Sequence, residues 1–294
     1  MRWRRVLGGL GRVLIAAGVL LLLFVAYQLW GTGLREAQAQ RSLEGEFAER
    51  VGDPDTTEPA PRRPSPVLEG DALARIRMPD IGVDKIVVEG VGLEDLKRGP
   101  GHYPGSPLPG QPGNAAIAGH RTTYGAPFNR IDELEPGAEI ELTTEQGTFV
   151  YAVSEQLIVE PDQVEVLDDF GDDRITLTAC HPEYSAAQRI VVTGQLVGET
   201  APAAPAAGAA AGPTPAQGNE AATSRALDVG LDGEEASRWP AVLLAVSCVL
   251  IWLAAWLLGA LWRKWPAYLL FLPVFLVMLF FFFESFSRLL PANF

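Results

Sequence analysis

The stretch RITLTACHPEYSAAQRIVVT, residues 174–193, contains two short runs of alternating or β-branched residues, separated by a polar segment. Runs of this kind are typical of β-strands, and two of them in close succession indicate a hairpin. Cys180 lies at the end of the first run, and Arg189 begins the second. If the two runs pair, the thiol and the guanidinium lie near the mouth of one cleft.

Further runs with strand character precede this stretch and are separated by Pro-Gly and Pro-Asp pairs. They occupy residues 74–78, 85–89, 115–118, 139–142 and 149–153. Many short strands with turn signals between them favour a β-barrel or a β-sandwich. We therefore predict one mainly β domain over residues 71–198. Helical structure is expected only as short pieces at 93–98, 128–134 and 161–167.

Composition excludes several classes of protein. The chain has 294 residues, of which 48% are hydrophobic and 20% charged, and its formal net charge is −13. This apolar content is too high for a fully disordered chain. Residues 31–238 carry 16 basic and 35 acidic side chains, a net charge of −19. A nucleic acid is therefore not an expected partner, since binding one requires a basic face.

Apolar residues gather at the two ends of the chain. The uncharged run 13–30 follows a basic segment, 1–12, which predicts a transmembrane helix with a cytoplasmic N-terminus. Two more apolar runs, 239–262 and 266–283, flank a short basic turn. They predict a helical hairpin with its bend in the cytoplasm and the tail, 284–294, outside. The lipid bilayer is thus a predicted partner, and the β-domain would be extracellular.

Two alternatives to this topology remain open. Ala37-Gln38-Ala39 fits the small-x-small pattern of a signal-peptide cleavage site, so the first run could be removed in the mature protein. The third run contains Pro273 and could be a re-entrant or interfacial segment.

The segments between the apolar runs and the β-domain have the composition of linkers. Residues 31–70 are acidic and rich in Pro, and we expect a disordered extracellular linker there. Within it, residues 36–50 could extend the first helix for a short distance. Residues 199–238, which are rich in Ala, Pro and Gly, predict a second linker.

The chemistry of the predicted domain centres on an unpaired thiol. The chain has two Cys, and Cys248 lies within an apolar run, so Cys180 has no disulfide partner outside the membrane. A thiol becomes a good nucleophile when a base takes its proton. His120 ends a strand-like run and could approach Cys180 at a neighbouring strand end, while Arg189 could stabilise an oxyanion. The simpler interpretation is a buried structural Cys with solvated His and Arg side chains.

Three segments resemble the signature segments of sortases, which are membrane-anchored cysteine transpeptidases of mainly Gram-positive bacteria. They are AGHR at 118–121, TLTACHP at 176–182 and QRIVV at 188–192. The longer stretches GPGHYPG at 99–105 and AGHRTTYGAPF at 118–128 resemble class E sortases of actinobacteria. Three segments in the right order with similar spacing are much more specific than a lone Thr-x-Cys.

The resemblance implies a sortase-like eight-stranded β-barrel with Cys180 as nucleophile, His120 as general acid/base and Arg189 as the residue that positions substrate and oxyanion. It implies cleavage of a C-terminal Leu-Ala/Pro-x-Thr-Gly motif between Thr and Gly, through a thioacyl-enzyme. The partners would be secreted proteins that bear this sorting signal and a peptidoglycan amine that accepts the acyl group. Tyr124 matches the class E tyrosine associated with Ala in the motif. No cofactor and no metal is implied.

The chain departs from the class E pattern at two points. Ala179 replaces an expected Thr, and the C-terminal hairpin is not part of the usual class E plan. Other classes of function also remain open: a catalytically idle surface domain that binds a wall polymer, or a thiol peptidase that hydrolyses its acyl-enzyme. A metal site built from His120, Cys180 and His181 would lack a fourth ligand at characteristic spacing.

Overall fold

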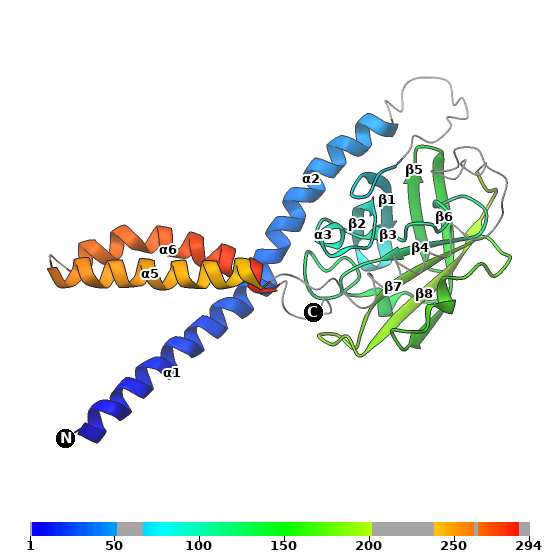
Figure 1. Cartoon of the computed structure of the whole chain (residues 1–294). Coiled ribbons are helices and arrows are strands. Elements are labelled where there is room, and N and C mark those ends of the chain that lie inside the picture. Colours follow the sequence, from blue (N-terminus) through cyan, green and yellow to red (C-terminus); the bar gives the residue numbers. More distant parts are fainter. Residues whose placement is uncertain (1, 52–66, 202–237, 262–263, 288–294) are drawn as a thin grey trace. The chain divides into compact units, whose positions relative to one another are not determined.

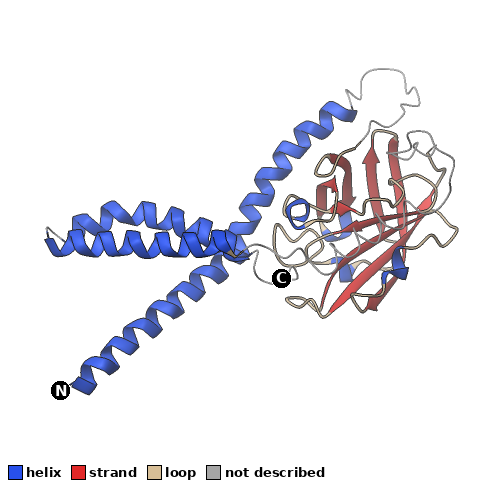
Figure 2. Cartoon of the chain, viewed as in Figure 1, coloured by secondary structure: helices blue, strands red, loops and turns tan. Residues whose placement is uncertain are grey.

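The computed structural model describes residues 2–51, 67–201, 238–261 and 264–287. The described residues fall into two compact units that divide at Gly31 and Thr32. One unit contains helices only, and the other contains a β-barrel with one long helix (Figures 1 and 2).

Eight strands close into a barrel in the order β1-β2-β3-β4-β7-β8-β6-β5. Their bounds are β1 Ala72–Met78, β2 Val83–Glu89, β3 Gly101–His102, β4 Asn114–Ala118, β5 Glu139–Thr144, β6 Gly147–Val159, β7 Arg174–His181 and β8 Gln188–Val197. The eight-stranded barrel confirms the predicted fold class. Strand β3 was not predicted, because two residues are too few to show a periodic pattern.

Side-chain alternation explains how the strands build the core. In β1, Ile76 and Met78 point into the barrel and are fully buried, while Arg77 between them points outward and pairs with Glu141 of β5. All five residues of β4 are buried, as expected of a strand that is covered on both faces. Burying each large apolar side chain stabilises the fold by about 1.5–3 kcal/mol.

Two of the strand pairs are parallel, β2 with β3 and β4 with β7, and the others are antiparallel. Parallel neighbours end at the same edge of a sheet, so the chain leaves β4 and β7 on the same side of the barrel. The short helices lie in the connections: η2 Pro79–Ile81, α3 Leu93–Leu96, η3 Ile131–Glu133 and η4 Val164–Leu167. The last three fall within the segments where short helical pieces were predicted.

The N-terminal part of the chain corrects the prediction of disorder for residues 32–51, which are helical, in agreement with the possible helix at 36–50. Helix α1 (Arg2–Ala26) and the π-helical turn η1 (Tyr27–Gly31) are followed directly by α2 (Thr32–Val51). Leu43 and Phe47 of α2 pack on apolar residues of β1 and β2, including Ile86. This burial supplies a stabilisation that the polar composition of the segment does not reveal. Residues 52–66 of the predicted linker lie outside the described residues, as do residues 202–237 of the second one.

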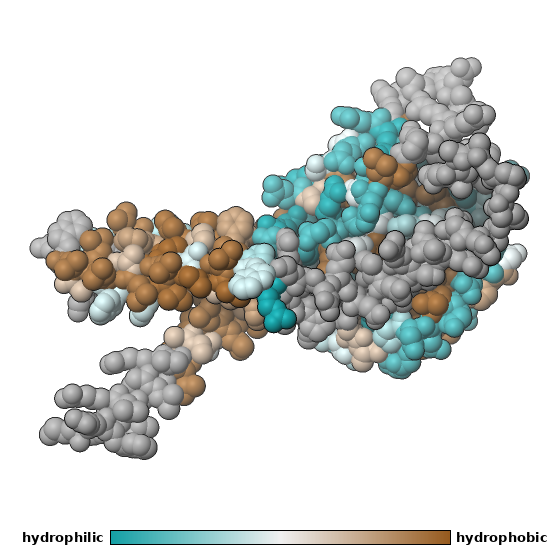
Figure 3. Space-filling view, viewed as in Figure 1, coloured by the Kyte–Doolittle hydropathy of each residue, from teal (hydrophilic) through white to brown (hydrophobic). Residues whose placement is uncertain are grey.

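Helices α5 (Trp239–Leu261) and α6 (Lys264–Ser287) pair side by side and present a hydrophobic surface (Figure 3). Trp239–Leu261 and Tyr268–Ser287 are long and apolar enough to cross a bilayer, since about 20 residues span its roughly 30 Å core. They are consistent with membrane anchoring. In α1 the apolar part is Leu14–Ala26, which is shorter, so the first predicted span stays a prediction. Helix α6 continues four residues beyond the predicted end at 283, and residues 288–294 lie outside the described residues.

Candidate active site

The parallel pair β4 and β7 determines where the candidate histidine and cysteine lie. Ala118 is the register partner of Thr178, and the amide of Gly119 donates to the Thr178 carbonyl at 3.0 Å. His120 follows Ala118 by two residues, and Cys180 follows Thr178 by two. Because side chains repeat every second residue along an extended chain, this register leads both side chains out at the same end of neighbouring strands.

The antiparallel pair β7 and β8 brings in the arginine. Cys180 and Arg189 are direct register partners, and side chains opposite one another in such a pair have Cβ atoms about 5 Å apart. The Arg189 side chain is buried, and its Nη1 donates to the carbonyls of Ala186 and Gln188, both at 3.1 Å. The guanidinium is therefore held against the β7–β8 connection beside the thiol.

Arg121, which the sequence analysis singled out only as part of a motif, ties these elements together. Its side chain is 5% exposed, and its Nη2 lies 2.8 Å from Asp132 Oδ2. Nε donates to the Asn129 carbonyl at 3.3 Å, and Nη1 donates to the Cys180 carbonyl at 3.5 Å. Nη1 also lies 3.2 Å from Nδ1 of His181. One buried guanidinium thus links the segment after β4 to the end of β7.

The electrostatic environment keeps both candidate catalytic groups neutral at rest. Burial lowers the pKa of His120 to about 4, and the positive charge of Lys97 acts in the same direction. At pH 7 only about one imidazole in a thousand is then protonated. Burial raises the pKa of the Cys180 thiol, and the charges of Arg189 and Arg121 offset this in part. The resting pair is therefore a thiol and an imidazole.

Tyr124 packs against the candidate histidine. Its ring centroid lies 5.2 Å from that of His120, with 36° between the planes, and its side chain is buried. Tyr124, Gly125 and Ala126 all have positive φ, at 49°, 74° and 44°. Among the described residues, His120 Nε2 is a buried atom without a hydrogen-bond partner. A group of a bound molecule is thus the natural partner for this nitrogen.

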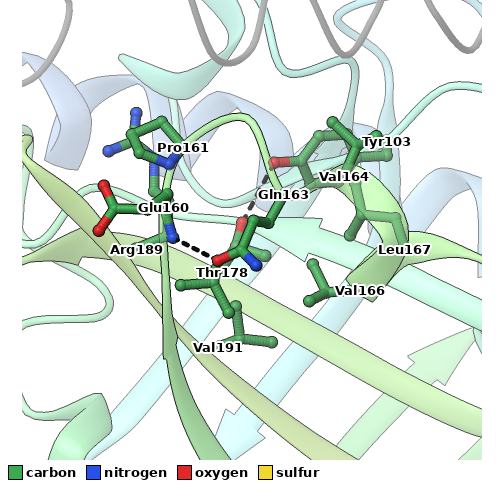
Figure 4. A pocket seen from close by; sticks show the side chains of 11 residues that line it. Tyr103, Glu160, Pro161, Gln163, Val164, Val166, Leu167, Thr178, Arg189 and Val191 are labelled. Carbon is green, nitrogen blue, oxygen red and sulfur yellow. Dashed lines mark hydrogen bonds between the residues drawn. The ribbon is translucent and has the colours of Figure 1, made fainter.

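A shallow pocket opens beside Arg189 (Figure 4). Its lining residues are Tyr103, Val159, Glu160, Pro161, Gln163, Val164, Val166, Leu167, Thr178, Arg189 and Val191. Tyr103 lies across the pocket from Arg189 and Glu160 in Figure 4, and its hydroxyl is 3.2 Å from Thr178 Oγ1. The segment around η4 therefore forms one wall, and β7 and β8 form the floor. The lining is mostly apolar with a few polar groups, as is typical of ligand sites.

His102 belongs to the GPGHYPG stretch at 99–105, and its contacts are those of a structural residue. It is fully buried, and its Nδ1 lies 2.7 Å from Glu89 Oε2, while Nε2 lies 2.9 Å from Ser106 Oγ and 3.0 Å from the Pro107 carbonyl. Burial alone would lower its pKa, but Glu89 and the Pro107 carbonyl outweigh burial and raise it. Both ring nitrogens are thus occupied by neighbouring groups of the protein, so His102 has a structural role.

The sequence of the barrel is similar to known proteins. The sequence profile of the sortase domain matches residues 76–197, from within β1 to the end of β8. Sortase SrtE1 of Streptomyces coelicolor is 36% identical over 210 residues, which cover 65% of this chain and 57% of SrtE1. The chain therefore spans little more than half the length of that relative.

Sortase SrtE2 of the same organism is 30% identical over 213 residues, which cover 64% of this chain and 81% of SrtE2. The solved structure of sortase E from Streptomyces avermitilis is 35% identical and covers 45% of this chain and 91% of its own, with a TM-score of 0.41. With the profile spanning the barrel and a relative matched over most of its length, this chain belongs to the sortase family of cysteine transpeptidases, and its similarity to class E members is pronounced.

Proposed function

We propose that this protein is a membrane-anchored transpeptidase that attaches secreted proteins to a cell-wall amine. Its substrate would carry a C-terminal Leu-Ala/Pro-x-Thr-Gly motif, which is cut between Thr and Gly. The observation that carries this proposal is the strand register. It brings Cys180 opposite Arg189 and leads His120 to the same end of the neighbouring parallel strand.

In the first half of the reaction, the thiol proton of Cys180 moves to the imidazole of His120. The sulfur then forms a bond with the carbonyl carbon of the motif's Thr, and the electron pair of the C=O bond moves to oxygen. Arg189 stabilises this oxyanion, a role that positioned donors perform best in a site sheltered from water. When the C–N bond breaks, the imidazolium gives its proton to the departing Gly amine. A thioacyl-enzyme remains.

In the second half, an amine of a peptidoglycan precursor attacks the thioacyl carbon and gives a proton to His120. The C–S bond breaks, and the imidazolium returns the proton to the sulfur. Cysteine suits both halves because a thiolate attacks well and also leaves well. Since the neutral pair dominates at rest, only a small fraction of molecules holds the reactive ion pair. Turnover would consequently be slow.

The pocket beside Arg189 is the proposed binding place of the sorting motif. Val164, Val166 and Leu167 offer an apolar wall for the residues before Thr, and Arg189 lies at the end of the pocket where the scissile carbonyl would be. Tyr124, which packs on the His120 ring, is the residue expected to favour Ala over Pro in the motif.

Three membrane spans would anchor the enzyme with the barrel outside the cell. Helices α1 and α6 belong to the same unit and contact each other near their C-terminal ends. The ring of Tyr27 lies 5.3 Å from that of Phe280, and Phe24 lies 5.3 Å from Phe283. Two helices that meet at their C-terminal ends have those ends on one face of a bilayer. This supports a multi-pass topology in which both run outward.

The decisive experiment incubates the full chain in detergent with paired Ala- and Pro-containing sorting peptides and an added amine, followed by mass spectrometry. We expect a thioacyl adduct on Cys180 and a product joined to the amine. Cys180→Ala should abolish both. A product in which only water has replaced Gly, even at high amine concentration, would identify a hydrolase. Peptide binding that persists in Cys180→Ala without any wild-type cleavage would identify a binding domain.

A further inference from the structure

Helix α2 presents a row of buried polar side chains to the barrel. Thr32, Glu36 and Gln40 follow one another at intervals of four residues, which places them on one face of the helix. Thr32 and Glu36 are 1% exposed and Gln40 is 6% exposed. Buried polar groups are costly unless each has a partner. The partners of this row therefore indicate what the helix does.

The first partner lies in the loop after His120. Thr32 Oγ1 accepts a hydrogen bond at 3.2 Å from the amide of Tyr124. Tyr124 begins a run of three residues with positive φ, two of which, Tyr124 and Ala126, are not glycine. Side chains rarely adopt this conformation, and it persists where the surroundings hold it. The Thr32 hydroxyl is one such restraint, and it comes from outside the loop.

The second restraint is the carboxylate of Glu36. It fills the space beside Gly125, where any added Cβ would collide with it. The carboxylate is itself anchored, because Lys85 Nζ of β2 lies 2.6 Å from Glu36 Oε1. Gly125 also has φ of 74°, so both the backbone and the neighbouring carboxylate require glycine here.

From these contacts we propose that α2 is a positioning element of the active site. Thr32 and Glu36 hold the loop of residues 123–126, and that loop holds the Tyr124 ring against the His120 imidazole. This inference rests on the proposed function of His120. It assigns a role in catalysis to a segment that lies outside the barrel and outside the part matched by the sortase profile.

Gln40 provides an internal control on the same helix face. Its Nε2 donates to the carbonyls of Ile86 and Arg98, at 2.9 and 2.8 Å, and its Oε1 accepts from the Ile86 amide at 2.7 Å. Gln40 therefore attaches α2 to β2 and to the segment after α3, and none of these contacts involves the His120 loop. If α2 were only a tether, loss of the Gln40 contacts and loss of the Thr32 contact would have the same kind of effect.

The test compares Thr32→Val with Gln40→Ala in the full chain in detergent. Thr32→Val keeps the shape of the side chain and removes the hydroxyl oxygen that accepts from the Tyr124 amide. We expect kcat for sorting-peptide cleavage to fall about tenfold with little change in KM. Thr32→Ser, which restores the hydroxyl, should recover most of the loss. Gln40→Ala should lower Tm while kcat stays within about twofold of wild type.

A second measurement is independent of turnover. If the Tyr124 ring moves, water reaches the imidazole, and the pKa of His120 should rise from about 4 toward its ordinary value of about 6.5. NMR titration of the labelled chain measures this shift directly. The charge of Lys97 acts on the imidazole and the Tyr124 ring packs on it, and Thr32→Val replaces neither residue. Gln40→Ala should leave the His120 titration unchanged.

The outcomes separate this inference from the proposed function. If the wild-type chain forms no thioacyl adduct, the proposed function fails, and the titration still tests whether α2 controls the imidazole. An unchanged His120 pKa in Thr32→Val, or an equal loss of kcat in Gln40→Ala, would overturn the inference. Should Thr32→Val fail to fold, Glu36→Ala applies the same test because it empties the space beside Gly125, and the same two results decide.

Discussion

Arg121 offers the sharpest test of how the site is assembled. We consider Arg121→Met, which keeps the length of the side chain and removes the buried guanidinium. This substitution removes the hydrogen bonds to the carbonyls of Asn129 and Cys180, at 3.3 and 3.5 Å, and the ion pair with Asp132 at 2.8 Å. Asp132 is 48% exposed, so its ion pair is screened and contributes at most about 1 kcal/mol.

The two carbonyl contacts are long, so each contributes at the low end of the range of about 1.5–3 kcal/mol for a hydrogen bond to a charged group. Adding the screened ion pair, and subtracting what the apolar Met recovers by burial, gives a loss of about 2 kcal/mol in the free energy of unfolding. That corresponds to a fall in Tm of about 6 °C for a domain of this size.

Arg121→Met should also weaken the nucleophile. The Arg121 charge helps to hold down the pKa of Cys180, so its removal raises that pKa further and reduces the fraction of reactive ion pair. We expect the rate of thioacyl formation to fall about tenfold, measured by mass spectrometry after rapid quenching. Arg121→Lys keeps a charge without the planar fork and should lie between wild type and Arg121→Met.

Arg130→Met is the matched control for this experiment. Arg130 lies near Arg121 in sequence, but its side chain is 52% exposed and pairs with the equally exposed Glu133 at 2.6 Å. Its replacement should leave Tm and the acylation rate unchanged. The reasoning would be refuted if Arg121→Met kept both the Tm and the acylation rate of wild type, or if Arg130→Met matched its losses.

Three other predictions follow from the same geometry. Arg189→Ala should lower kcat about 10²–10³-fold, because an oxyanion would lose a positioned donor, and steady-state kinetics with a sorting peptide measure this; a loss confined to KM would contradict it. Because the Cys180 pKa is raised, alkylation by iodoacetamide should still be accelerating above about pH 8.5, and a plateau near pH 7 would mean a thiolate at rest. The raised pKa of His102 stabilises the fold fully below its unfolded value of about 6.5, and this stability is lost as pH rises through the folded pKa. Tm of the wild type should therefore fall with rising pH more steeply than that of His102→Gln, and parallel curves would exclude the Glu89–His102 pair as the cause.

The candidate site was predictable in part, because its chemistry depends on residue types at strand ends. Cys180 and Arg189 flank one short connection, and a hairpin between two strand-like runs brings them opposite one another, as the observed register has it. The approach of His120 was harder to predict. It depends on β4 and β7 being parallel neighbours, although 55 residues lie between the end of β4 and the start of β7.

The role of Arg121 was not predictable from its motif. Two of its four contacts lie at or just before η3 and two lie at the end of β7, and no local pattern links them. The polar face of α2 shows a related difficulty. Thr32, Glu36 and Gln40 lie in a segment whose polar composition predicts a linker. The sequence alone does not show whether a polar side chain will hydrogen-bond to water or to protein.

Local patterns thus determine the strands, the apolar helices and the residue types that can act as nucleophile, base and oxyanion donor. The alternation of apolar and polar residues and the length of an apolar run are properties of neighbouring residues, so they can be recognised before the fold is known. Barrel closure determines the rest: which strand ends become neighbours, that Arg121 bridges them, and that Thr32 and Glu36 support the His120 loop. These contacts join residues distant in the chain, and their energies exist only once the barrel and α2 have been brought together.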